Sequence, residues 1–466
     1  MQQREVDVAI LGAGSAGLYA LSQVKRAGKS YVIMDGGPLG TTCARVGCMP
    51  SKAVIQIGHD LHRRRWMERA GVAGTDRLRP DPAQAMALVR KLRDGLSAGP
   101  AARVEKLGEH FIPHHGCFVA PGVIEAGDVR VQAGSVIIAT GSSPVVPRAW
   151  QAFGSRVLTT DTLFEQDELG PRLAVVGLGA IGLELGQALV RWGLEVHGFD
   201  LAQAIGGIQD YVVQAQGRAL IGRELPMTLG HEVHIEAVDG GLRISAGKTE
   251  FICDQVLASL GRRPNLGGLN LEAAGIEVGE DGLPDFDPQT MQIGQSRVFL
   301  AGDVDGQRPL LHEAGDEGRI AGYNACVDTP RRWRRKTPLG IVFTDPNLCV
   351  VGPAFDSLDE DEIAIGEADF TTQGRAVLIG EDSGVLRVYA EVETGRLIGA
   401  SMACPGGEHI AHLLAWSIEQ GLTVFDLLKM PFYHPVLEEG LQDALYDLLH
   451  EVEAKAARPL ELRPAD

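Results

Sequence analysis

Long hydrophobic runs are absent from this 466-residue sequence, and so is any excess of positive charge. No apolar stretch approaches the roughly 18 residues that a membrane-spanning helix needs, so we expect no membrane insertion. The formal net charge of −18 argues against nucleic acid and anionic membranes as partners. The one basic run, residues 331–336 (RRWRRK), lies between Pro330 and Pro338 and is predicted to be a solvated linker.

The start of the chain lacks a signal-peptide pattern, because Glu5 and Asp7 interrupt its apolar residues and glycines follow at once. Cysteine is scarce: there are seven, and most are too widely scattered for a disulfide framework. These features predict a cytoplasmic protein, in which a disulfide is usually catalytic or regulatory. No Cys or His cluster completes a metal site, so no metal is expected.

Residues 41–52, TTCARVGCMPSK, bring Cys43 and Cys48 together. In a regular helix, residues five apart have Cα atoms roughly 8–9 Å apart, whereas a disulfide needs less than about 7 Å. Either the two thiols are unrelated, or a helix starts irregularly between them. Gly47 has the backbone freedom for this, and Pro50 favours an extended residue 49 ahead of a helix start. A redox dithiol and two buried thiols both remain open.

The stretch VDVAILGAGSAGL predicts a short buried strand, a glycine-rich turn with Gly12, Gly14 and Gly17, and a helix to about Ala27. A second strand ends at Asp35. Such glycines permit a tight turn and close backbone approach to a pyrophosphate at the helix N-terminus. The acid is placed to accept hydrogen bonds from a ribose. A single copy of this pattern is weak evidence.

The unit occurs twice, because residues 172–200 repeat it with Gly177, Gly179, Gly182 and Asp200. In both copies the acid follows the first glycine by 23 residues. We therefore predict two dinucleotide sites. A dithiol next to the first suggests a flavin that exchanges electrons with the thiols, and a nicotinamide at the second. The chain length suggests two to four domains.

Five further stretches follow in order: IIATGSSP (137–144), LGRRPN (260–265), VFLAGDVDG (298–306), FTDP (343–346) and YHPVLEEG (433–440). With the two glycine loops, they make the chain resemble the pyridine nucleotide–disulfide oxidoreductases over nearly its whole length. Within that family the likeness is greatest to the dihydrolipoamide dehydrogenase branch. The resemblance implies a flavoprotein that oxidises a dihydrolipoyl dithiol through a Cys43–Cys48 disulfide and FAD to reduce NAD+.

The implied fold is α/β, with two Rossmann-like domains for FAD and NAD and an α+β C-terminal dimerisation domain. The expected segments are a first FAD part (1–148), an NAD domain (149–269), a central part that completes the FAD site (270–338) and an interface domain (339–466). The strand and helix patterns agree, because they alternate up to about residue 270 as parallel α/β layers require. After Pro338 the strands GVLRVYAEVE and GRLIGASMA precede the helix GEHIAHLLAWSIEQG.

The resemblance also implies catalytic roles. Cys43 is the interchange thiol, Cys48 lies against the flavin, and His434 is the base, oriented by Glu439 and reaching the partner subunit's dithiol in a homodimer. An imidazole suits proton exchange with thiols near neutral pH, although a His-Pro followed by two acids is also a good helix start. Lys52 is expected beside the flavin and paired with Glu184, whereas the simpler interpretation makes both of them surface residues.

Several residues are expected to contact the cofactors. Asp303 is expected on the flavin's ribityl chain and Asp200 on the 2′-hydroxyl of NAD, where it would repel the 2′-phosphate of NADP. No arginine follows in LAQAIGG to bind that phosphate. The full predicted set is Gly12, Gly14, Gly17, Asp35, Thr42, Lys52, Gly116, Thr140, Gly141, Asp303, Leu311, His312, Gly177, Gly179, Ile181, Gly182, Asp200 and Gly261.

The chain departs from the family around the disulfide. Thr41 replaces a usual glycine, Ala44-Arg45 replaces Leu-Asn, and Phe432 and Val436 flank the His-Pro pair in place of the usual residues. The expected partner is a lipoyl-bearing carrier protein or a small dithiol or disulfide.

Two other functions stay open. One is an NAD(P)H-dependent reductase of another small disulfide, and the other is a non-catalytic flavin-binding redox sensor or scaffold. The retained base pair argues against the sensor. Arg45 could lower the pKa of the Cys43 thiol, dock an acidic carrier domain, or simply face solvent.

Overall fold

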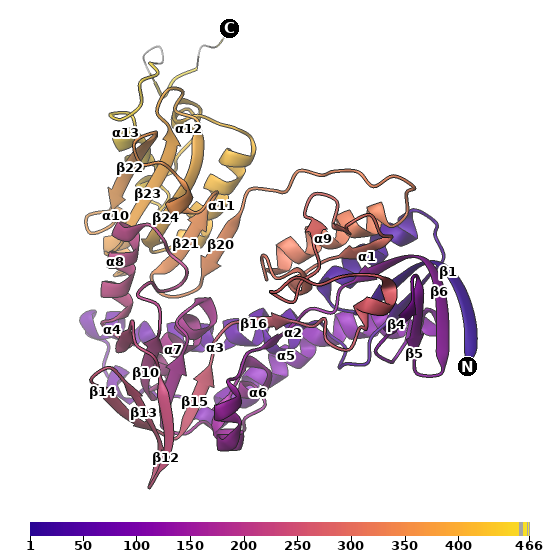
Figure 1. Cartoon of the computed structure of the whole chain (residues 1–466). Coiled ribbons are helices and arrows are strands. Elements are labelled where there is room, and N and C mark those ends of the chain that lie inside the picture. Colours follow the sequence, from indigo (N-terminus) through magenta and orange to yellow (C-terminus); the bar gives the residue numbers. More distant parts are fainter. Residues whose placement is uncertain (456–459, 464, 466) are drawn as a thin grey trace.

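The computed structural model describes residues 1–455, 460–463 and 465; residues 456–459, 464 and 466 of the expected interface domain lie outside the described residues. Figure 1 shows three bodies: one at the N-terminus, one built around α7 and β10, and a C-terminal one that ends in α13. No helix within the described ranges has the length and apolar content that a bilayer crossing requires. The α/β fold class predicted from sequence is confirmed.

The first body is a nine-stranded sheet in which β17-β18-β19-β6-β1-β2-β3 lie in that order, with β5 also paired to β6 and to β4. The central strands run parallel. Residues 286–300 thus rejoin a sheet begun by residues 2–138. The bounds are β1 Gln2–Leu11, β2 Tyr31–Met34, β3 Phe111–Ile112, β4 Cys117–Ala120, β5 Val123–Ala126, β6 Val129–Ile138, β17 Phe286–Asp287, β18 Gln292–Ile293 and β19 Val298–Leu300.

Helices cover this sheet and carry the cysteine pair. Helix α1 (Ser15–Arg26) packs against α9 (Leu311–Asn324), where a Cβ on Gly318 would lie 2.3 Å from the Ala16 carbonyl oxygen. Only glycine permits so close a crossing. The helices that follow β2 in the chain are α2 Thr42–Val46, α3 Cys48–His62, α4 Arg64–Arg69 and α5 Pro82–Glu105, of which α3 and α5 share a buried cluster with the second body.

The second body repeats the parallel design with a five-stranded sheet ordered β11-β10-β9-β15-β8. A three-stranded antiparallel sheet and a two-stranded ribbon, β7 with β16, adjoin it. The bounds are β7 Ser142–Pro144, β8 Val157–Leu158, α6 Thr160–Leu163, β9 Arg172–Val176, α7 Ala180–Trp192, β10 Glu195–Asp200, α8 Tyr211–Ile221, β11 Met227–Leu229, β12 His234–Val238, β13 Gly241–Ala246, β14 Thr249–Cys253, β15 Gln255–Ala258 and β16 Arg262–Pro264.

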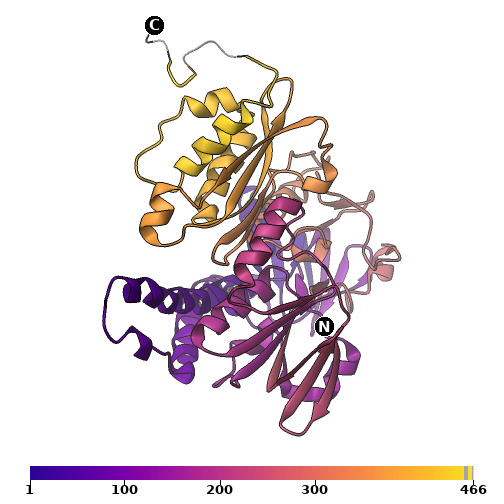
Figure 2. The ribbon, with the colours of Figure 1, turned by 90° about the vertical axis from the view of Figure 1, so that its left-hand side faces the viewer.

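The third body is an antiparallel sheet ordered β20-β21-β24-β23-β22, with helices packed against it (Figure 2). Its β23 and β24 are strands predicted from sequence, and the predicted helix after them is α11. The bounds are β20 Leu339–Val342, β21 Asn347–Val351, β22 Ile363–Asp369, α10 Gly374–Ile379, β23 Val385–Glu391, β24 Leu397–Cys404, α11 Gly407–Glu419, α12 Val424–Leu428 and α13 Glu439–Leu448.

A buried polar network joins the second and third bodies. The fully buried Asp210 accepts hydrogen bonds from Arg387 Nη1 at 2.7 and 2.8 Å and from the Tyr389 hydroxyl at 2.6 Å. The same carboxylate caps α8, where it accepts from the Val212 and Val213 amides. Because its charge is buried, removing a single partner would be costly.

The basic run at residues 331–336 is only partly the solvated linker expected. It is extended and mostly exposed, but the Arg335 side chain is only 16% exposed and its Nη2 lies 2.6 Å from Glu313 Oε2 and 2.5 Å from Glu317 Oε1. Both acids are on α9. The expectation was wrong for Arg335 because its partners are distant in sequence.

Candidate functional site

The first glycine loop has the shape that a dinucleotide requires. Gly12 has φ of +108°, and a Cβ there would lie 2.2 Å from the Ala139 carbonyl oxygen. A Cβ on Gly17 would lie 2.0 Å from the Gly12 oxygen, whereas Gly14 faces open space. Gly14 is also the N-cap of α1 and supplies no side-chain acceptor, so the helix amides there stay available for a phosphate.

The second loop reproduces the first. A Cβ on Gly177 would lie 2.3 Å from the Ser259 carbonyl oxygen, one on Gly182 would lie 1.9 Å from the Gly177 oxygen, and Gly179 faces open space at the N-cap of α7. The equal sequence spacing therefore corresponds to equal geometry.

The acid at the end of each second strand holds its loop. Asp35 accepts hydrogen bonds from the Ala13 and Gly37 amides, both at 2.8 Å. Asp200 likewise accepts from the Leu178 amide at 2.5 Å and the Ala202 amide at 2.8 Å. Each carboxylate oxygen has a second lone pair for a ribose hydroxyl.

A cavity of about 480 Å³ opens beside the second loop. Gly177 and Asp200 line it, and sequence reasoning named both. Most of the other lining residues come from the segment before β8 and from the start of β12 with the loop that precedes it, and sequence reasoning did not name them: Trp150, Phe153, His231, Glu232 and His234 among others. No lysine or arginine lines this cavity among the described residues.

The cysteine pair lies at a break between two helices. Cys43 is in α2 and Cys48 begins α3, with Gly47 between them at φ −123° and ψ −119°. The irregular start predicted at Gly47 is confirmed. The prediction that residue 49, before Pro50, is extended is wrong, because α3 already includes Met49. Proline is tolerated there since first-turn amides have no helical partner.

The Cys43 and Cys48 side chains are free thiols joined by a hydrogen bond. The hydrogen bond from Cys43, aided by Lys52 and opposed by burial, lowers the pKa of Cys48 to about 7. The same bond, together with burial, raises the pKa of Cys43. Cys48 is therefore the thiol that ionises first, as its expected place beside a flavin requires.

Lys52 lies one turn along α3 from Cys48, and its Nζ donates to Glu184 Oε2 at 2.8 Å. The other carboxylate oxygen of Glu184 accepts from the Phe343 amide at 2.9 Å, and the ammonium lies 4.3 Å from the centre of the Phe343 ring. Glu184 is 5% exposed, so it is not the surface residue of the simpler interpretation.

Lys52 is a cation that lowers the pKa of both thiols. The Arg45 side chain donates from Nη1 to the Pro38 carbonyl oxygen at 3.4 Å. The roles suggested for Arg45, in the pKa of Cys43 and in docking, stay predictions.

Substitutions of this ion pair should move the Cys48 pKa in opposite directions. We expect Lys52→Met to raise it, because a cation that favours the thiolate is lost. Glu184→Gln should lower it, since the Glu184 charge raises the pKa of Cys48. The measurement is the pH dependence of iodoacetamide alkylation of the reduced protein. Shifts of the same sign in both variants would contradict this electrostatic account.

Thr41, where the family usually has glycine, has φ of +67° and ψ of 146°. A β-branched residue is strained in this region, which favours glycine. In return, its hydroxyl accepts a hydrogen bond from the Ala44 amide at 3.3 Å and caps α2. The usual glycine is thus explained by the backbone conformation.

We expect Thr41→Gly to stabilise the protein by about 1 kcal/mol, because relief of roughly 1–3 kcal/mol of backbone strain exceeds the entropic cost of glycine. Thr41→Ala should destabilise it by about 1 kcal/mol, since the strain stays and the cap is lost. Urea unfolding of the FAD-loaded protein measures both. A Thr41→Gly variant less stable than the parent would show that the cap outweighs the strain.

Asp303 lies at the end of the β7–β16 ribbon. The Ser142 hydroxyl donates to its Oδ2 at 2.7 Å, and Arg262 Nε donates to the same hydroxyl at 2.7 Å. Sequence reasoning missed Ser142 and Arg262, which have no distinctive spacing. Thr140 Oγ1 donates to the Asn265 carbonyl oxygen at 2.8 Å, which fixes the turn before this ribbon.

The structure places the other predicted cofactor residues at loop and helix ends. Gly141 and Gly261 have positive φ values and face open space, which suits a loop beside a ligand. Gly116 is buried against the first sheet. The exposed members of the set are Thr42, Gly179, Ile181, Gly261, Leu311 and His312.

His434 Nδ1 lies 2.9 Å from Glu439 Oε1, and the second oxygen of Glu439 accepts from the Val436 amide at 3.0 Å. The bond with His434 lowers the pKa of Glu439. The imidazole is 80% exposed and, among the described residues, has no hydrogen bond or ion pair other than that with Glu439. It lies between α12 and α13, which Figure 1 places well apart from α2 and α3. One chain does not bring His434 to its own cysteines.

Comparison with known proteins gives this geometry its context. Residues 6–318 match the model of the pyridine nucleotide-disulphide oxidoreductases, and residues 339–445 match the dimerisation domain of that family. The chain belongs to the pyridine nucleotide-disulphide oxidoreductase family. As a member it is an oxidoreductase that uses FAD and a nicotinamide dinucleotide, and its dimerisation domain supports a homodimer. The family resemblance inferred from sequence is confirmed.

Relatives and solved structures span nearly the full length. The chain is 30% identical to dihydrolipoyl dehydrogenase of Thermus scotoductus, over 96% of this chain and 97% of the relative. It is 30% identical to that of Staphylococcus aureus, over 94% and 96%. Among solved structures it resembles LpdA of Mycobacterium tuberculosis, with a TM-score of 0.82 and 24% identity over 96% of this chain and 100% of that one. The flavoprotein disulfide reductase RclA of Escherichia coli also gives 0.82, at 21% identity over 94% and 99%.

The residues present fit both dinucleotides. Each glycine loop has one open glycine at a helix N-terminus, and each has two glycines whose side-chain positions are filled by backbone. The first loop belongs to the body that carries the thiols, which suits FAD. The second opens on the 480 Å³ cavity, which suits the nicotinamide dinucleotide.

Proposed function

We propose that the protein is an NAD-dependent dihydrolipoyl dehydrogenase that acts in the cytoplasm on a lipoyl-bearing carrier protein. The observation that carries the proposal is the cysteine pair, two hydrogen-bonded thiols of which Cys48 has its pKa lowered to about 7. Several relatives at about 30% identity carry this name.

The thiol chemistry follows from the two different pKa values. In the oxidised protein a substrate thiolate attacks the Cys43 sulfur, and Cys48 departs as the thiolate, since a thiol of low pKa leaves faster. The second substrate thiolate then attacks the substrate sulfur of the mixed disulfide and displaces Cys43. The substrate leaves as a disulfide, and two electrons remain on the Cys43–Cys48 dithiol. FAD, when bound, supplies the two-electron relay from this dithiol to the nicotinamide.

His434 is proposed to accept the proton of the attacking substrate thiol. Because its Nδ1 faces Glu439, its Nε2 is the free position for a proton. Glu439 fixes the ring and stabilises the imidazolium. Since His434 lies apart from the thiols of its own chain, we assign it to the dithiol of the partner subunit.

Asp200 sets the choice of nicotinamide dinucleotide. It lines the 480 Å³ cavity together with Glu232, without a lysine or arginine in the described lining, so an added 2′-phosphate would meet two carboxylates and neither a lysine nor an arginine. We expect kcat/KM for NADH to exceed that for NADPH by about 10- to 100-fold, because repulsion between the 2′-phosphate and the Asp200 carboxylate costs roughly 1–3 kcal/mol. Asp200→Asn should narrow this ratio, and equal values in the parent would contradict the assignment.

Two alternatives remain to be tested. An NAD(P)H-dependent reductase of another small disulfide is favoured by the altered surroundings of the thiols, in particular Thr41 and Arg45. A non-catalytic redox sensor or scaffold is disfavoured by the retained His434–Glu439 pair, since a sensor needs no substrate base.

The experiment that tests the proposal is a steady-state assay of the FAD-loaded protein with lipoamide, dihydrolipoamide and glutathione disulfide, each with both nicotinamides. Dihydrolipoamide with NAD+ should give the highest kcat/KM. A preference for glutathione disulfide would favour the second function. No turnover with any pair would favour the sensor.

A further inference from the structure

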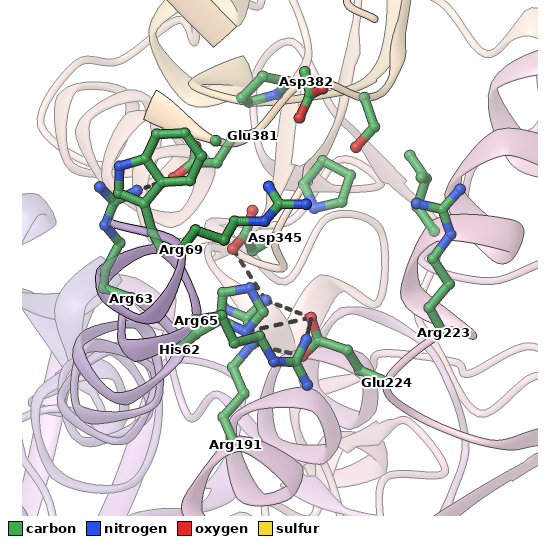
Figure 3. Close-up of a pocket in the computed structure, with 16 residues that line it drawn as sticks. His62, Arg63, Arg65, Arg69, Arg191, Arg223, Glu224, Asp345, Glu381 and Asp382 are labelled. Atoms are coloured by element: carbon green, nitrogen blue, oxygen red, sulfur yellow. Dashed lines mark hydrogen bonds and ion pairs between the residues drawn. The ribbon is translucent and has the colours of Figure 1, made fainter. Parts of the chain in front are cut away.

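A second cavity, of about 450 Å³, lies where the three bodies meet (Figure 3). Its walls come from the end of α3 and from α4 of the first body, from α7 and the end of α8 of the second, and from loops of the third around residues 345, 381 and 405. Cys48 begins α3 and His62 ends it, so the cavity is at the opposite end of the helix that carries the redox pair.

The lining is unusually rich in arginine. Five of its sixteen residues are arginines, in a chain whose acids outnumber its lysines and arginines by 61 to 43. Four acids also line it, so the cavity is a small region of positive excess on an acidic protein. The arginines are Arg63, Arg65, Arg69, Arg191 and Arg223, and the acids are Glu224, Asp345, Glu381 and Asp382.

The acids are used at the floor of the cavity. Arg191, 7% exposed, donates from Nε to Glu224 at 2.8 Å and from Nη2 to Asp345 at 3.0 Å. Its Nη1 is buried and has no hydrogen-bond partner within the described residues. Arg65 also approaches Glu224, at 3.8 Å. The pairing at the floor thus leaves one nitrogen of the Arg191 guanidinium without an acceptor in the described part of the chain.

Two arginines on the walls have no acidic partner among the described residues: Arg69 and Arg223, both exposed. Figure 3 shows Arg69 reaching across the cavity above Asp345 and Arg223 on the opposite side. The Arg69 Cζ atom lies over the Trp66 ring, 5.8 Å from its centre.

We propose that this cavity binds a small anion that carries two or more phosphate groups. Guanidinium groups present paired N–H donors that match phosphate oxygens, and two of them without acidic partners among the described residues on facing walls, together with the unpaired Nη1 of Arg191, suit a ligand with several phosphates. The volume is within the range of small-molecule sites, roughly 300–1,000 Å³, and exceeds what a single phosphate needs. Free pyrophosphate and a nucleoside diphosphate share this chemistry, and Trp66 offers a base a stacking surface.

The test uses the FAD-loaded homodimer with saturating NAD+, which keeps the second dinucleotide site filled. With the nicotinamide site occupied by NAD+, isothermal titration with pyrophosphate and with ADP should still show one binding site per chain. Arg69→Gln and Arg223→Gln should each weaken binding by at least about 10-fold, as expected for loss of a charge-assisted hydrogen-bond pair. Arg103→Gln is the matched control, because Arg103 is an exposed arginine on α5 outside the cavity.

The arms of the titration also identify the source of the phosphates. If ADP binds more tightly than pyrophosphate, and Trp66→Ala weakens the binding of ADP but not that of pyrophosphate, the ligand is a nucleotide. Equal affinities that do not depend on Trp66 would assign free polyphosphate. If neither probe shows saturable binding up to roughly 10 mM, the proposal is wrong. Unchanged binding in the Arg69→Gln/Arg223→Gln double variant would also overturn it.

Discussion

Cys43→Ser and Cys48→Ser are each expected to lower turnover with a dithiol substrate by at least about 10⁴-fold, because either change removes the Cys43–Cys48 disulfide that is proposed to exchange with substrate. The two variants should differ in the thiol that remains. Cys48 should keep a lowered pKa in Cys43→Ser, since Lys52 stays and a serine hydroxyl can still donate a hydrogen bond. Cys43 in Cys48→Ser should keep a higher pKa, because burial raises the pKa of Cys43 more than Lys52 lowers it.

Alkylation against pH and absorbance of the FAD-loaded protein measure this difference. Near pH 7, Cys48 in Cys43→Ser should alkylate several-fold faster than Cys43 in Cys48→Ser. A long-wavelength absorbance from a thiolate beside the flavin should persist in Cys43→Ser and disappear in Cys48→Ser. Cys326→Ser, which changes a half-buried thiol outside the pair, is the control for the loss of a cysteine as such. If the absorbance instead persists in Cys48→Ser and disappears in Cys43→Ser, the roles of the two thiols are exchanged.

His434→Gln should lower kcat by about 10²- to 10⁴-fold, the usual effect of removing a general base. Glu439→Gln should lower kcat less, because Glu439 only orients the imidazole of His434 and stabilises its protonated form. Tyr433→Phe is the matched control: this neighbour is 81% exposed, and its change should leave turnover near that of the parent. A pH-independent, unchanged kcat in His434→Gln would remove His434 from the mechanism.

Mixing subunits decides whether His434 acts on the partner. Co-refolding Cys43→Ser chains with His434→Gln chains should restore about a quarter of parental activity, since half of the dimers are mixed and each has one complete site. If the mixed dimers, isolated through two different affinity tags, stay inactive, the base and the thiols belong to the same chain.

The sequence by itself determined the two dinucleotide loops and the break at Gly47. These depend on residues within about 30 positions of one another, so glycine spacing and strand–helix periodicity are sufficient to specify them. The common interval of 23 residues between glycine and acid gives the same pair of amide contacts at Asp35 and at Asp200. The antiparallel strands and helix after Pro338 were equally readable, because each is a short periodic segment.

Contacts between distant segments were decided by the tertiary structure. Lys52 and Glu184 are 132 residues apart, and only the family resemblance suggested that they pair. Nothing local marks Arg335 as mostly buried or Arg69 and Arg223 as facing one cavity. The lowered pKa of Cys48 is also a result of the tertiary structure, since it depends on the hydrogen bond from Cys43, on burial and on Lys52 together. Charges and hydrogen bonds take their effect from what packing places around them, and a local sequence pattern does not contain that information.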